Sequence, residues 1–195
     1  MRMVQTFRKL ARNRLMGYDA GTDTFVDALN PCIFESSGRW ISERVGFNAR
    51  RVLLVENPVY PTYDIVKIGD DTVEHILYSE QRNVLRNSAY LYDYTLLDKT
   101  NEAQAVTLTT VPSASGMGGT LTESLSAAFP IHMVRFAATS SSEQDHVDFS
   151  RLYAFAPGSL TIDEDMELEV DGGDRYVITE AVEELLCIRL SVTRR

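Results

Sequence analysis

The pattern of hydrophobic and polar positions is that of β-strands over most of the chain. In the stretch 88–98, SAYLYDYTLLD, Tyr90, Tyr92 and Tyr94 occupy alternate positions, as residues do on one face of a strand. Residues rich in strand formers or alternating in polarity recur further along. They predict strands at 52–55, 63–68, 72–78, 105–111 and 131–139, whereas 147–156 alternates in polarity without a decisive strand pattern.

Two stretches predict tight hairpins. Residues 63–78 hold two strand patterns around Gly69-Asp70-Asp71, and residues 166–179 hold two around Asp171-Gly172-Gly173-Asp174. Glycine and aspartate adopt the positive φ angles that such turns need. A third strand pattern follows the second hairpin to the last residue. Because the two hairpins follow the same scheme, the sequence is compatible with two related β modules or with one barrel that contains two similar hairpins.

Other stretches predict irregular structure or short helices. Residues 1–15 have apolar positions near helical spacing, and 16–50 are rich in glycine and serine, with one helical turn expected at 24–29. Residues 121–129 predict a short helix capped by Thr120 or Thr122. We therefore expect a mainly β protein, a barrel or sandwich with a short helix or two. Residues 1–50 would form an N-terminal extension, and 51–195 a β domain with a Gly-rich loop insertion around 112–120.

The composition excludes several classes of protein. Of the 195 residues 44% are hydrophobic, which is enough for a core, and no apolar run approaches the length of a membrane span. The first residues lack the pattern of a secretory signal, so we expect synthesis in a cytosol. Cys32 and Cys187 are distant from each other and have no ligand-spaced partner, so both are expected to be reduced and buried.

The charge of the chain is uneven. The first 14 residues contain five bases and no acid, and since the whole chain carries −9, the rest carries −14. The five bases are Arg2, Arg8, Lys9, Arg12 and Arg14. Such a segment could be a solvated helix, a tail that docks on an acidic neighbouring subunit, a contact to a nucleic-acid backbone or an organellar presequence.

The candidates for chemistry do not form a recognisable catalytic or metal-binding pattern. Gly116-Met117-Gly118-Gly119 lacks the lysine and helix of a phosphate loop, so a loop or assembly arm is the better interpretation. The acidic run 163–169 lacks the spacing of a calcium loop and fits a solvated strand edge. His75, His132 and His146 are isolated in sequence, and a hydrolase would need them to converge. We expect no enzyme activity, no catalytic residue, no cofactor and no metal.

The tyrosines at 90, 92 and 94 could form a platform for single-stranded nucleic acid. Acids outnumber bases between 63 and 98, however, and would repel phosphates. Tyrosine combines a large contact area with a polar tip and is common in protein interfaces. We therefore expect Tyr90, Tyr92 and Tyr94 to contact another subunit, together with Met117 and the five N-terminal bases.

The stretches 58–97 and 166–195 resemble the small β-barrel neck proteins of tailed bacteriophages, which join the portal to the tail as head-completion, adaptor and stopper proteins. The likeness covers roughly 52–98 and 159–195 and includes the phrase Asp-Gly-Gly-Asp-Arg-Tyr-Val at 171–177, with one extra turn residue. The first 50 residues and the Gly-rich stretch do not match, which leaves a tail terminator, tail tube or capsid decoration protein as alternatives.

The resemblance implies a structural virion protein, made in the host cytoplasm and not associated with a membrane. It would form a ring of about six or twelve identical subunits, as closed heterologous contacts allow. Its partners would be portal, adaptor or tail proteins, and its acidic body would line a channel through which DNA passes without sequence-specific contact. The basic residues 2–14 would latch an acidic neighbour. The alternative from another class is a cytosolic module that binds a ligand or peptide on its tyrosine-bearing sheet.

Overall fold

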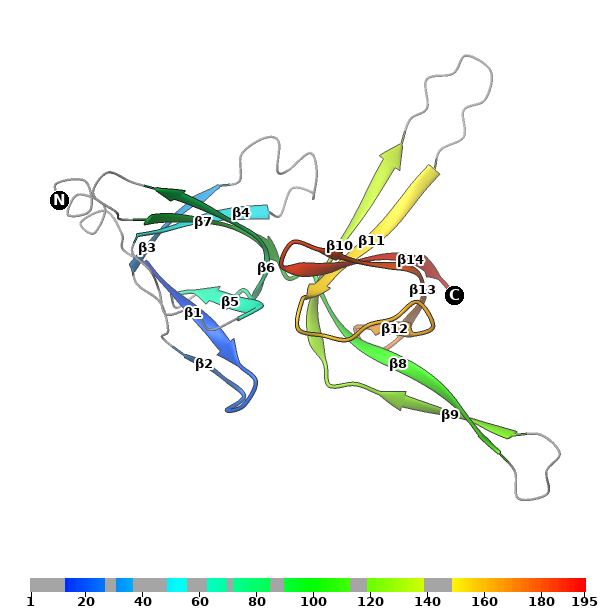
Figure 1. The fold of residues 1–195 in the computed structure, drawn as a ribbon. Coiled ribbons are helices and arrows are strands. Elements are labelled where there is room, and N and C mark those ends of the chain that lie inside the picture. The colour runs from blue at the N-terminus through cyan, green and yellow to red at the C-terminus, as the bar shows by residue number, and fades with distance from the viewer. Residues whose placement is uncertain are drawn as a thin grey trace, which may run out of the picture. The chain divides into compact units, whose positions relative to one another are not determined.

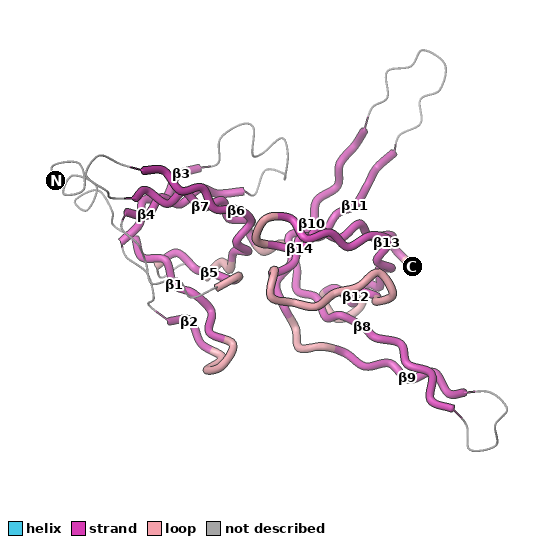
Figure 2. The backbone as a smooth tube through the Cα atoms, in the orientation of Figure 1, coloured by secondary structure: helices cyan, strands magenta, loops and turns pink. Residues whose placement is uncertain are grey.

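Strands make up every regular element of the described chain, which confirms the mainly β fold (Figures 1 and 2). The computed structural model describes residues 13–26, 31–36, 49–55, 63–69, 72–84, 90–112, 119–138 and 149–195. The chain divides into two compact units. The first comprises residues 1–99 with the short segments Pro157–Ser159 and Glu183–Ile188, and the second comprises the remaining residues.

The first unit contains a sheet that closes on itself. Its strands are β1 (Asn13–Asp19), β2 (Thr24–Val26), β3 (Pro31–Ser36), β4 (Ala49–Val55), β5 (Ile65–Ile68), β6 (His75–Val84) and β7 (Tyr90–Asp98). They are antiparallel in the order β2-β1-β3-β4-β7-β6-β5. Because β5 also pairs with β1, from Leu15↔Ile68 to Gly17↔Val66, the sheet forms a small barrel.

Alternate side chains of these strands fill the interior of the first barrel. Its core cluster joins β1, β5 and β7, with Leu77 of β6 and Tyr63 packed against it. The buried members are Leu15, Val66, Ile68, Tyr94 and Leu96. Each buried side chain of this size stabilises the fold by roughly 1.5–3 kcal/mol relative to exposure. The barrel is therefore held together by a packed interior.

The second unit contains a second closed sheet. Its strands are β8 (Asn101–Pro112), β9 (Gly119–Leu125), β10 (Phe129–Ala138), β11 (Phe149–Pro157), β12 (Glu167–Val170), β13 (Asp174–Glu184) and β14 (Cys187–Arg194). Their order is β10-β11-β14-β13-β12-β8-β9, and β10 pairs with β8 as well. On β8, Ala103 and Ala105 lie opposite Val170 and Leu168 of β12. All four are buried, so small and large side chains alternate across these strands.

Both predicted hairpins are confirmed. Strands β5 and β6 pair through Ile65↔Ile76, and Gly69 after β5 has a positive φ of 58°. Strands β12 and β13 pair up to Val170↔Asp174, and the turn between them has φ values of 50° at Asp171 and 71° at Gly172. The third strand predicted at the end of the chain is β14.

The N-terminal third differs from the prediction of an extension. Strands β1, β2 and β3 lie within 13–36 and belong to the first barrel, and the helical turn expected at 24–29 begins as strand β2. Gly17 was interpreted as a loop signal, but a Cβ atom there would lie 1.9 Å from the Tyr63 ring. It is a packing glycine inside a strand. A helix was predicted over residues 1–15, but residues 13–15 belong to strand β1, and residues 1–12 lie outside the described residues.

Two further predictions are corrected. Residues 121–125 belong to strand β9 and not to a helix, because threonine and serine at alternate positions fit a strand better than a helix. Residues 51–195 do not form one β domain, since the first compact unit takes in residues up to Lys99. Among the described residues no helix is long and apolar enough to cross a membrane.

Candidate assembly surface on the second unit

A hairpin arm formed by β8 and β9 extends from the second barrel (Figure 1). Beyond Val106, which is fully buried, residues 107–112 of β8 pair only with β9 among the described strands. Every residue of β9 is exposed. Val111, Leu121 and Leu125 expose 52%, 61% and 50% of their surface. A two-stranded ribbon with both faces in water is marginal by itself, which points to a binding role.

The two faces of the arm differ in chemistry. Residues opposite each other in an antiparallel pair share a face. The registers Leu108↔Glu123 and Thr110↔Leu121 define a leucine face, which Leu125 extends. The other face carries mainly hydroxyl groups: Thr107, Thr109, Val111, Thr120, Thr122 and Ser124.

The arm contains no ionisable residue from 107 to 122, although 24% of the whole chain is charged. Met117, a predicted partner contact, belongs to this uncharged stretch, but residues 113–118 lie outside the described residues. The cores of protein interfaces are depleted of charge. An uncharged arm can approach an acidic protein without electrostatic repulsion.

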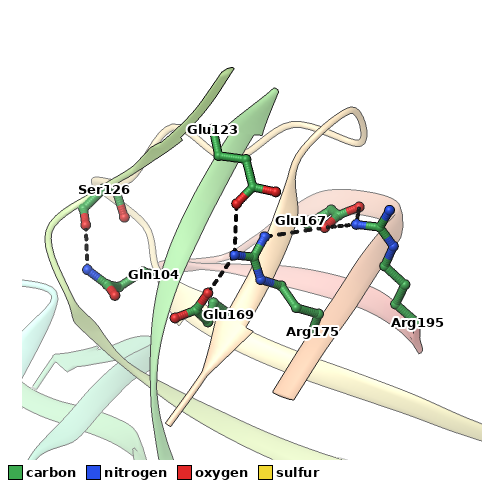
Figure 3. Close-up of polar contacts among 7 residues, drawn as sticks. All are labelled: Gln104, Glu123, Ser126, Glu167, Glu169, Arg175 and Arg195. Atoms are coloured by element: carbon green, nitrogen blue, oxygen red, sulfur yellow. Dashed lines mark hydrogen bonds and ion pairs between the residues drawn. The ribbon is translucent and has the colours of Figure 1, made fainter. Parts of the chain in front are cut away.

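A ladder of ion pairs ties the base of the arm to its own barrel (Figure 3). Arg175 on β13 places Nη2 3.0 Å from Glu123 Oε2 on β9 and 2.7 Å from Glu169 Oε2 on β12. Its Nη1 lies 3.7 Å from Glu167 Oε2. Arg195 Nη1 donates to both carboxylate oxygens of Glu167 at 3.0 Å. The ladder therefore connects the arm with two barrel strands and the last residue.

The surroundings of Arg175 favour the charged form of its guanidinium group. The hydrogen bond to Glu123 is the largest cause that raises the pKa of Arg175; partial burial acts in the opposite direction, and the charges of Glu123 and Glu169 add to the rise. The Arg175 side chain is 25% exposed and that of Glu123 is 47% exposed. Ion pairs this exposed are screened by solvent and contribute little to stability, so the ladder orients the arm more than it stabilises the fold.

Ser126 shapes the other edge of the arm, where the chain turns from β9 towards β10 (Figure 3). The backbone N of Ser126 donates to Ala105 O, and its Oγ accepts from Ala105 N, both at 2.9 Å. Gln104 Nε2 donates to Ser126 O at 2.9 Å. These bonds fix the register at which the arm begins.

The acidic run 163–169 is divided between two roles. Asp163, Glu164 and Asp165 are exposed in the segment before β12, as expected for solvated residues. Glu167 is buried and ion-paired, and Glu169 pairs with Arg175. Among the described residues no group of three or more histidines, cysteines or acids is arranged to hold a metal ion.

The tyrosine prediction is wrong for Tyr94. Its side chain is 3% exposed and packs in the core of the first barrel, so it cannot contact a subunit or a ligand. The backbones of Tyr90 and Tyr92 lie on β7, but their side chains are outside the described residues. Of the five N-terminal bases only Arg14 is described, and it is exposed on β1. Arg2, Arg8, Lys9 and Arg12 lie outside the described residues.

The two described histidines are buried on strands. His75 on β6 is fully buried, with Nδ1 2.9 Å from Asp98 Oδ1 on β7, and its Nε2 has no hydrogen-bond partner among the described residues. His132 on β10 is buried in the other sheet and its ring lies 6.2 Å from that of Phe155. His146 lies outside the described residues. Tight packing, and not an open site, surrounds the two described imidazoles.

Cys187 is a free, buried thiol, as expected. Burial, with a smaller contribution from the charge of Glu184, raises its pKa from 9.0 to about 12. A thiol that stays protonated at neutral pH is a poor nucleophile. The side chain of Cys32 lies outside the described residues.

One feature of the sequence could have indicated the arm, although the strand and helix patterns did not. The triplet Thr-Leu-Thr occurs at 107–109 and again at 120–122, and the uncharged stretch spans both. Searches against models of protein families and against curated proteins found no match to this chain.

Proposed function

We propose that the protein is a structural subunit that assembles with copies of itself into a ring, in the neck that joins head and tail of a tailed-phage particle. The exposed β8–β9 arm is the observation that carries the proposal. Its apolar side chains Val111, Leu121 and Leu125 are the kind of surface that monomers rarely leave uncovered. The particle role also draws on the resemblance of 52–98 and 159–195 to neck proteins. A tail terminator, tail tube or decoration protein would use the same arm.

The acidic composition supports passage of DNA through such a ring. With a net charge of −9, a channel lined by this protein would repel the phosphate backbone, so DNA would slide without adhering. In the particle, the partners would be the portal, adaptor or tail proteins above and below the ring. The competing binding-module role is weakened because Tyr94 lies inside a barrel.

The test is the native mass of the full chain, measured over a range of concentrations, with electron microscopy of the same sample. We expect a closed oligomer of about six or twelve copies. A matched variant in which Val111, Leu121 and Leu125 are replaced by serine should remain folded and shift to monomer, because these side chains are exposed in the single chain. A wild-type protein that stays monomeric at all concentrations would refute the proposal.

A further inference from the structure

Strand β9 presents an open backbone edge along the arm. Among the described strands it pairs only with β8. The hydrogen bond from Ser126 N to Ala105 O shows which residue pairs of β8 and β9 are hydrogen-bonded, because antiparallel bonds recur at every second residue. The bonded pairs are therefore Thr107↔Ser124, Thr109↔Thr122 and Val111↔Thr120. The N–H groups of Leu121 and Glu123 point to the open edge.

Strand β10 presents a second open edge on the same unit. It pairs with β8 only from Phe129 to Ile131, and beyond that point it pairs only with β11 among the described strands. Thr100 N donates to Ile131 O at 2.9 Å, and Met133 N donates to Thr100 Oγ1 at 2.7 Å. The same alternation turns the backbone groups of Arg135 and Ala137 outwards on this side. The two hairpins leave the second barrel in different directions (Figure 1).

Each edge carries one acidic residue or one arginine and little other protection against pairing. Proteins protect edge strands with lysine, proline, inward charges or bulges. The sequence of β9, GTLTESL, contains one charge, Glu123, which Arg175 already binds. On β10 the one proline, Pro130, lies in the part that pairs with β8. Two weakly protected edges on one chain favour pairing between copies.

The charges on the two edges are complementary. Glu123 is the only acid of β9, and Arg135 is the only arginine or lysine of β10 and is exposed. Both residues direct their backbone groups outwards, so they can oppose each other in a hydrogen-bonded antiparallel pair. The same register places Leu121 opposite Ala137. Nucleic acid is a poor alternative occupant because the arm has no base between 107 and 122.

We propose that β9 of one copy adds to the open edge of β10 of a second copy, antiparallel, with Glu123 opposite Arg135. This inference rests on the proposed function and specifies its contact. Because the two edges are different surfaces of one chain, the contact is heterologous, and repeating it builds a ring when the rotation closes. The backbone bonds supply affinity, and the opposite charges select the register.

The register is tested with the double variant Leu121→Cys and Ala137→Cys, oxidised at a concentration where wild type assembles. We expect a ladder of disulfide-linked multimers on a non-reducing gel. Each single variant and wild type should give no ladder. The double variant Leu121→Cys and Arg135→Cys is the register control. It should cross-link at least tenfold less, because position 135 is offset by two residues from the position opposite 121 in the proposed register. A covalent dimer from Leu121→Cys alone would overturn the proposal in favour of two-fold pairing of β9.

Two variants of Leu121 distinguish backbone pairing from side-chain packing. Leu121→Pro removes the outward N–H, and Leu121→Ala keeps it. We expect the proline variant to lose assembly and the alanine variant to keep most of it, with equal circular dichroism. Equal behaviour of the two variants would overturn strand addition. In another outcome, duplex DNA or lipid vesicles protect the β9 amides from hydrogen exchange while the protein stays monomeric. That result would show that the edge of β9 does not bind a second copy.

The outcomes distinguish the two proposals. If wild type forms rings but the double cysteine variant gives no disulfide-linked multimers, the proposal of strand addition between β9 and β10 fails and the ring function remains. If wild type is monomeric, both proposals fail.

Discussion

At the scale of single residues, Gly17 shows how a barrel position can resemble a loop in sequence. It lies on β1 between two pairing partners, Val26 on β2 and Val66 on β5. The Tyr63 ring occupies the space where a side chain would stand. Gly17 therefore lies inside a strand because only a residue without a side chain fits there, whereas its residue type alone predicts a loop.

The replacement Gly17→Ala should destabilise the protein. The new Cβ atom would lie 1.9 Å from Tyr63 Cδ2, so the ring must leave its place against the core. We expect a loss of roughly 1–3 kcal/mol in the free energy of unfolding, as for other overpacked sites. Chemical denaturation measures it. Gly173→Ala is the matched control, since nothing lies within 4 Å of its Cβ position, and an equal loss in both variants would contradict the packing argument.

The Cys187 thiol should resist alkylation in the native protein. Its pKa of about 12, raised by burial and then by Glu184, leaves almost no thiolate at pH 8. In the unfolded chain the pKa returns towards its ordinary value of 9.0. The thiol therefore favours the folded state below pH 9, and this contribution is lost as the pH rises towards 12.

Peptide mapping after iodoacetamide treatment at pH 8 checks this expectation and separates Cys187 from Cys32. We expect modification of Cys187 to be slower by two orders of magnitude or more in the native protein than in denaturant, on the order of the shift in pKa. Comparable rates in the two conditions would show that the thiol is accessible.

At the scale of elements, the pattern of alternation predicted strands where one face is buried and the turn is tight. The hairpin around Asp171 and Gly172 could be predicted because the turn residues themselves need positive φ angles. Strand β9 was missed because both of its faces are exposed, so the alternation of Thr120, Thr122 and Ser124 corresponds to no difference in burial. The ion-pair ladder was equally invisible, since it joins Glu123, Glu169 and Arg175 across three strands.

The replacement Arg175→Gln should loosen the arm with little effect on the barrel. It removes the ion pairs to Glu123 and Glu169, which together hold the base of β9. We expect the amides of β9 to exchange with solvent several-fold faster, while the free energy of unfolding changes little. Hydrogen exchange followed by mass spectrometry resolves the two effects.

Arg194→Gln is the matched control, because Arg194 pairs with Asp174, which is not part of the arm. The distance from Arg194 Nη2 to Asp174 Oδ1 is 2.6 Å. It should leave exchange at β9 unchanged. Equal acceleration in the two variants, or none in Arg175→Gln, would remove the orienting role of the ladder.

At the scale of the whole molecule, the uneven charge remains a prediction about assembly. The bases Arg2, Arg8, Lys9 and Arg12 precede β1, whose Leu15 is 2% exposed in the core. A deletion that tests the latch must therefore stop at residue 12. Deletion of 1–12 should weaken ring formation at low salt and have less effect in 0.5 M salt, where charges are screened within about 4–5 Å.

Native mass titration measures this change. The full-length variant with these four bases replaced by glutamine should match the deletion if charge is responsible. Unchanged assembly in both variants would exclude the latch.

The two similar hairpins left open two β modules or one barrel, but the boundary between the two units could not be predicted from the sequence. The first unit includes Pro157–Ser159 and Glu183–Ile188 from the far half of the chain. Within that unit Ser159 N donates to Asp64 Oδ2 at 2.6 Å, and Leu186 N donates to Tyr78 O at 3.2 Å. Bonds between residues this distant leave no local trace in composition or periodicity.

The late segments of the first unit affect the order in which its contacts can form during translation. A ribosome that has released only the first ninety-nine residues has not yet supplied the segments that bond to Asp64 and Tyr78. All strands of the first barrel have then been supplied, but the bonds that Ser159 and Leu186 donate to it can form only after residue 186 has been added.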